Sequence, residues 1–188
     1  MEDAKPPSVK NREVIFLRKT QKLTVTAMFI AIGTLTSHAF FIPIGISKVF
    51  PVQHFINVLS AILLGPYYAV AQALVVSIFR NLMGTGSIFA FPGSMVGAFL
   101  AAYLFKKTRK PIMAFIGEVI GTGIIGAMLC YPISTLLLGK EATLFGLIPA
   151  FIFSSFAGAA MGYGLLKVFL KNPGTAKKMN EAATQHRG

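Results

Sequence analysis

Uninterrupted apolar runs as long as a lipid bilayer is thick constrain this sequence more than any other feature. The first run covers residues 23–44, which is 22 residues. At 1.5 Å per residue, a helix of about 20 residues crosses a hydrocarbon core of about 30 Å. The apolar part of a signal peptide has only about 7–15 residues. We therefore interpret this run as a retained transmembrane helix.

Five more apolar segments follow, separated by linkers that contain glycine or proline. The linker "IPIGISKVFP" after the first run is predicted to be a loop. Only 13% of the residues are charged, against roughly 25% in a soluble domain. The sequence therefore predicts an all-α membrane protein, a bundle of about six transmembrane helices. The other five helices are expected at residues 51–64, 67–80, 88–105, 112–138 and 144–170, of which the first two are short for a full span.

The basic residues predict how the chain sits in the membrane. The formal net charge is +12, which in a soluble protein would suggest nucleic acid binding. Here the charges flank the apolar runs, so no nucleic acid partner is expected. With the N-terminus inside, 15 of the 18 Lys and Arg residues face the cytoplasm, and Lys48, Arg80 and Lys140 face outward. The positive-inside rule then places both termini in the cytoplasm, with a basic segment at 1–22, the membrane domain at 23–170 and a polar tail at 171–188.

Three polar residues at the start of the second predicted helix are the strongest candidates for chemistry. At about 100° per residue, Gln53 and Asn57 share one narrow face, and His54 lies at its edge. Apolar residues fill the rest of this helix, so the polar face is expected to look inward. Polar groups inside a membrane are costly unless they have partners, and they often mark a ligand site or a pathway. An interhelical hydrogen-bond cluster is the structural alternative.

Further candidates lie on the neighbouring predicted helices. Glu118 is the only acidic residue within an apolar run, and Thr122 lies one turn further along the same face. Glu118 could pair with Arg80 or His54, or stay protonated. The remaining candidates are polar residues near the outer ends of the third and fourth helices: Arg80, Asn81 and Ser94.

Small residues recur at a spacing of four, which lets helix backbones approach closely. Packing within the bundle is the expected role of such pairs. They are Ala27/Ala31, Ala69/Ala73, Gly93/Gly97, Gly117/Gly121 and Gly158/Gly162.

Several functional classes lack their motifs in this sequence. Gly139-Lys140 is followed by Glu141, so "LLLGKEAT" is not a phosphate-binding loop and the chain does not hydrolyse ATP by that route. No serine elbow or H-E-x-x-H motif is present. The three histidines lack the spacing of a metal site, and the single cysteine, Cys130, excludes an internal disulfide. We therefore expect no enzyme activity, metal or cofactor.

Three long stretches resemble a known family: "FPVQHFINVLSAILLGPYYA", "RNLMGTGSIFAFPGSMVGA" and "GEVIGTGIIGAMLCYPI". They are similar to the ThiW type of S component, the substrate-binding subunit of energy-coupling factor (ECF) transporters. The similarity covers residues 22–170. It implies a bacterial or archaeal cell-membrane protein that captures a vitamin precursor on the outer face. A membrane T component and two cytoplasmic ATPase subunits would supply the energy, and Ala27 and Ala31 match the family's motif for docking to the T component.

The resemblance further implies hydroxyethylthiazole, the thiazole precursor of thiamin, as the ligand. This small neutral molecule needs hydrogen-bond partners for its ring nitrogen and hydroxyl, and an apolar or aromatic wall. Two other functions remain open from the residues: a small proton-coupled carrier that uses Glu118, and a structural subunit without a ligand. The expected polar partners are Gln53, His54, Asn57 and Ser94, the expected wall is Phe50, Phe89, Phe91 and Tyr131, and Glu118 and Thr122 are expected below the ligand.

Overall fold

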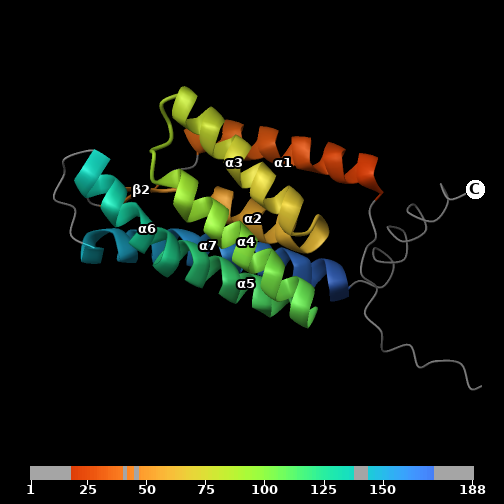
Figure 1. Ribbon diagram of the computed structural model, residues 1–188. Helices are drawn as coiled ribbons and strands as arrows, with labels where there is room; N and C mark the ends of the chain where they lie inside the picture. The colour runs from red at the N-terminus through yellow and green to blue at the C-terminus, as the bar shows by residue number, and fades with distance from the viewer. Residues whose placement is uncertain (1–17, 40–41, 45–46, 138–143, 172–188) are drawn as a thin grey trace, which may run out of the picture.

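Roughly parallel helices make up the computed structural model (Figure 1), which describes residues 18–39, 42–44, 47–137 and 144–171. The expected segment before residue 18 and the tail from residue 172 lie outside these ranges. One helical segment is continuous through α5 (Pro111–Ile120), η1 (Gly121–Gly126), α6 (Ala127–Pro132) and η2 (Ile133–Leu137), where η marks π-helix. The others are α1 (Lys19–Ala39), α2 (Pro51–Leu63), α3 (Pro66–Leu82), α4 (Ala90–Thr108) and α7 (Leu144–Lys171).

Proline and backbone conformation explain where several helices begin and end. Pro51, Pro66 and Pro111 each occupy the first turn of a helix, where the missing N–H costs nothing. Gly65 separates α2 from α3 with a φ of +87°, a conformation that glycine adopts readily. The five later helices therefore lie within three residues of their predicted ends.

The segment after the first helix differs from the prediction. The apolar run was expected to be helical to residue 44, but α1 ends at Ala39. β1 (Ile42–Ile44) and β2 (Ser47–Val49) then form a short antiparallel hairpin, with Ile42 opposite Val49. The proline at position 43 would break a helix interior, whereas a proline is tolerated in an edge strand. The predicted loop is therefore mostly a hairpin.

Glycines allow the central helices to approach very closely. Figure 1 shows α4 between α3 and α5. A Cβ atom on Gly117 would lie 2.7 Å from the Cα of Ala101, and one on Gly126 would lie 2.6 Å from the Cα of Gly93. Four of the five predicted small-residue pairs are buried within the bundle, as expected. Ala27 and Ala31 are the exception, because both are exposed on α1.

Large apolar side chains remain exposed around the bundle, as a lipid-facing surface requires. Leu35 is 68% exposed, Tyr67 80% and Leu82 78%. Other exposed large apolar side chains lie on α4, α6 and α7, among them Phe99, Met128 and Phe156. By length and composition, two stretches within the described residues are able to cross a membrane, Pro111–Leu136 and Leu147–Phe169.

Candidate functional site

The polar face of α2 points into the bundle. Gln53 is 4% exposed, His54 8% and Asn57 0%. Each of the three makes hydrogen bonds to a neighbouring helix rather than to its own backbone. The helical period of the sequence therefore identified the inward face correctly.

Glu118 on α5 is the hydrogen-bond partner that His54 and Asn57 share. Its Oε1 accepts hydrogen bonds from Asn57 Nδ2 at 2.9 Å and from Thr122 Oγ1 at 3.1 Å. Nδ1 of His54 lies 2.8 Å from the same oxygen. Of the partners considered for Glu118, the structure selects His54. The carboxyl group is fully buried, so these contacts take the place of water at Oε1, whereas Oε2 has no hydrogen-bond partner among the described residues.

Ser94 connects the same face to α4. Its hydroxyl accepts hydrogen bonds from Gln53 Nε2 at 2.8 Å and from Asn57 Nδ2 at 3.0 Å. The same Thr122 hydroxyl also lies 3.1 Å from the carbonyl oxygen of Gly93, immediately before Ser94, so its single proton is shared between the two acceptors. The polar network therefore joins α2, α4 and α5–η1 inside the bundle.

Arg80, in the last turn of α3, extends the network toward one end of the bundle. Its Nη1 donates to Gln53 Oε1, and its guanidinium lies 3.8 Å from the centre of the Phe50 ring. Arg80 is only 2% exposed. Gln53 thus connects Arg80 to Ser94.

A cleft that is partly open to solvent lies beside Arg80 and Gln53. Its walls are too close together to admit a water molecule. α1 contributes to the lining, although none of its residues was among the predicted ligand contacts. The lining residues are Gly33, Thr36, Ser37, Phe50, Val52, Gln53 and Arg80.

Two predicted site residues lie outside the network. Asn81 donates to the carbonyl oxygens of Ser77 and Ser87, so it holds the turn between α3 and α4. Tyr131 is 42% exposed on α6, and no hydrogen bond identified among the described residues joins it to the network. Of the aromatic wall that was expected, Phe50 covers Arg80, and Phe89 packs near Cys130.

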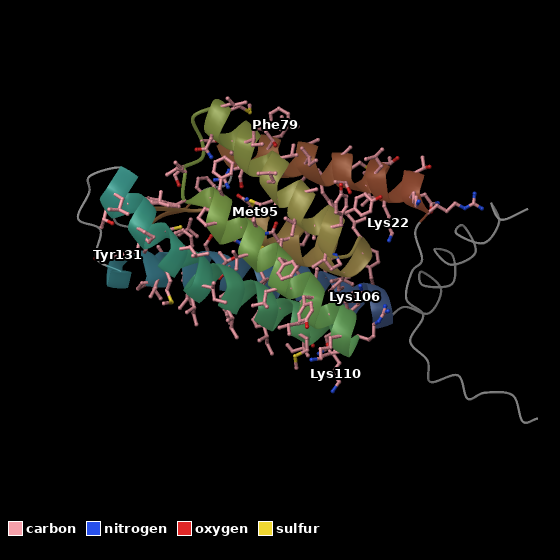
Figure 2. All side chains as sticks on the ribbon, viewed as in Figure 1. Lys22, Phe79, Met95, Lys106, Lys110 and Tyr131 are labelled. Atoms are coloured by element: carbon pink, nitrogen blue, oxygen red, sulfur yellow. The ribbon has the colours of Figure 1, made fainter. Side chains whose placement is uncertain are left out.

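Basic side chains gather at the opposite end of the bundle. Figure 2 shows Lys22, Lys106 and Lys110 near one end and Tyr131 near the other. The beginning of α1 and the end of α7 also lie at the lysine end (Figure 1). The cleft therefore lies away from the end where the described basic residues are concentrated.

Comparisons with known proteins address the family and the fold. A family model described as "Thiamine-precursor transporter protein (ThiW)" matches residues 23–172. One similar solved structure is described as "Structure and mechanism of the S component of a bacterial ECF transporter". It covers 82% of this chain and 100% of its own, with 22% sequence identity and a TM-score of 0.66. At that identity the likeness establishes the fold alone. No curated protein matches the chain.

Proposed function

Because the chain belongs to the ThiW family of thiamine-precursor transporter proteins, we propose that it is the substrate-capture subunit of an ECF-type ABC vitamin importer. The family consists of transporters, not enzymes. The S-component fold supports a subunit that binds its ligand and leaves the energy supply to others. The lack of a phosphate-binding loop agrees with this division of labour.

The buried polar network is the observation that carries the proposed binding role. We propose hydroxyethylthiazole as the ligand, bound from the outer face where Gln53 and Arg80 adjoin the cleft. The ring nitrogen accepts a hydrogen bond, the hydroxyl group needs a donor and an acceptor, and Phe50 provides an aromatic surface. The proposed contacts are Gln53, His54, Asn57, Arg80, Ser94, Glu118 and Thr122, whereas Asn81 and Tyr131 are left out because neither shows a hydrogen bond to these side chains among the described residues.

The proposed membrane arrangement is multi-pass, in the cell membrane, with both termini in the cytoplasm. The clustering of Lys22, Lys106 and Lys110 at one end supports this orientation. The cleft then opens at the outer side, where a vitamin precursor arrives.

The proposed partners are a membrane T component and two cytoplasmic ATPase subunits. Ala27 and Ala31 are exposed on α1, unlike the four small-residue pairs that pack inside the bundle. An exposed pair of small residues leaves a shallow strip on which another helix is able to pack closely. This difference in burial supports a docking role for the pair.

Calorimetry on the purified full chain tests the ligand. Thiamin, its pyrimidine precursor and hydroxyethylthiazole are titrated separately, and we expect the tightest binding for the thiazole. Binding of the pyrimidine or of thiamin alone would contradict the thiazole assignment. Absence of binding by all three would contradict the capture role.

A transport assay separates the proposed function from a proton-coupled carrier. The purified protein alone, in vesicles with a pH gradient, is expected to bind hydroxyethylthiazole without accumulating it. Gradient-driven accumulation that Glu118→Gln abolishes would establish the carrier instead.

A further inference from the structure

Arg80 is a buried cation that lacks a carboxylate partner within the part of the chain that the structure describes. Glu118 is the single acidic side chain in those ranges, and it is engaged by His54, Asn57 and Thr122. The hydrogen bonds of Arg80 go to neutral oxygens, those of Gln53 and of the Thr85 carbonyl. Its Nε has no partner among the described residues.

The positive charge of the Arg80 guanidinium is only partly compensated by its surroundings. The Phe50 ring stabilises it through a cation–π contact, and the carboxyl end of α3 carries a partial negative charge. Neither replaces a full negative charge, and an unpaired charge away from water is costly. Arg80 is therefore able to pair with an anionic group that arrives with the ligand, once the walls of the cleft move apart to admit it.

The cleft beside Arg80 offers suitable chemistry for such a group. Besides Gln53, two hydroxyl-bearing residues of α1 line it, Thr36 and Ser37. Both hydroxyls now donate to carbonyl oxygens of their own helix, at 2.7 Å and 2.6 Å. A hydroxyl rotates to suit its partner, so both are able to turn toward an oxyanion. A guanidinium with flanking hydroxyls is a common arrangement for carboxylate and phosphate recognition.

We propose that Arg80 forms an oxyanion subsite, so that the preferred ligand is a thiazole bearing a negatively charged substituent. This inference rests on the proposed function and narrows its substrate class. The thiazole ring would occupy the site proposed for hydroxyethylthiazole, and a phosphate or carboxylate in place of the free hydroxyl would meet Arg80. Charge-assisted hydrogen bonds of this kind increase affinity by roughly 10- to 100-fold over a neutral partner.

Calorimetry with four probes tests the subsite on the full chain. The probes are hydroxyethylthiazole, its phosphate monoester, the matching thiazole acetic acid and inorganic phosphate. In the unmodified protein, we expect the phosphate ester, the carboxylate or both to bind at least 10-fold more tightly than the alcohol. The two anionic probes distinguish a phosphate subsite from a carboxylate subsite, and inorganic phosphate shows how much of the affinity the anion alone provides.

Two variants and a control test whether Arg80 causes the preference for the anionic thiazole. The preference is measured as the ratio of the affinity for the anionic thiazole to the affinity for the alcohol. Arg80→Gln is expected to remove this preference. Arg80→Lys keeps the positive charge and is expected to retain part of the preference. Lys110→Gln removes one positive charge from the exposed opposite end and is expected to leave the ratio unchanged. The ratio in the unmodified protein is informative even where a variant fails to fold.

The possible outcomes distinguish a failure of the oxyanion subsite from a failure of the proposed capture function. If the alcohol binds and neither anionic thiazole binds more tightly, the subsite is wrong and the capture role stands. A preference that survives Arg80→Gln would also overturn the assignment to Arg80. If no thiazole binds, both proposals fail.

Discussion

His54 on α2 and Glu118 on α5 form a buried pair, with Nδ1 of the histidine 2.8 Å from Oε1 of the glutamate. The two residues are 64 positions apart in the sequence. Their pairing therefore joins two helices that are distant in the sequence and places two polar side chains in the interior of the bundle. Removing one member of such a pair leaves the other buried without its partner, which costs more free energy than the pair contributes.

His54→Ala and Asn57→Ala should each weaken binding of hydroxyethylthiazole. His54 pairs with Glu118 and Asn57 donates to it, and in the proposed site both residues also face the ligand. Leaving a desolvated group without its partner costs roughly 1–3 kcal/mol, or about 5- to 150-fold in affinity. Calorimetry measures the affinity, and thermal unfolding of the same samples measures stability.

Ser60→Ala is the control for these two variants. Ser60 is buried on the same helix, one turn deeper, where it bonds to Gln72 and to the carbonyl oxygen of Asn57. We expect a lower melting temperature without a change in affinity. If His54→Ala and Asn57→Ala behave in the same way, the polar face of α2 serves packing alone.

Gly97→Ala should disturb the network without removing any polar group. A Cβ atom at this position would lie 2.0 Å from Thr122 Oγ1 and 2.9 Å from Glu118 Oε2. Overpacking of this kind typically costs about 1–3 kcal/mol of stability. Thermal unfolding of the purified variant should show a clear loss.

Gly164→Ala provides the matched control on α7. Nothing lies within 4 Å of a Cβ atom there, and alanine stabilises a helix interior by roughly 0.5–1 kcal/mol relative to glycine. The same substitution should therefore lower the melting temperature at position 97 and keep or raise it at position 164. Equal effects at the two positions would contradict the close approach of α4 to η1.

The helices and the inward polar face were predictable because each depends on local sequence. Prolines mark the helix starts, and the helical period decides that Gln53 and Asn57 share a face. Burial of that face follows from the cost of exposing amides to lipid. The close packing of Gly117 against α4 also follows from its spacing to Gly121.

Distances between helices could not be predicted in the same way. The sequence offered both Arg80 and His54 as partners for Glu118, and only the packing of α2 on α5 decides for His54. The contribution of α1 to the cleft was missed because a hydroxyl in an apolar run is ambiguous. Thr36, for example, bonds to the carbonyl oxygen of Ile32 in its own helix while it also lines the cleft.

Fusions to alkaline phosphatase should confirm that the C-terminus is cytoplasmic. The enzyme is active only outside the cytoplasm, so a fusion after residue 171 should be inactive. A fusion after residue 139, in the linker before α7, should be active. The expectation follows from the 15 of 18 basic residues that this topology places inside. The opposite pattern of activity would invert the topology and turn the cleft toward the cytoplasm.

Replacing Ala27 or Ala31 with tryptophan should prevent assembly with a T component and leave ligand binding intact. Both alanines are exposed, so the bulky side chain needs no space inside the bundle but fills the strip on which a partner helix would pack. Ala39→Trp, an exposed alanine at the other end of α1, should leave both properties unchanged. Co-purification with the T component measures assembly, and calorimetry measures binding. A variant that loses ligand binding yet still assembles would show that this face of α1 serves capture rather than docking.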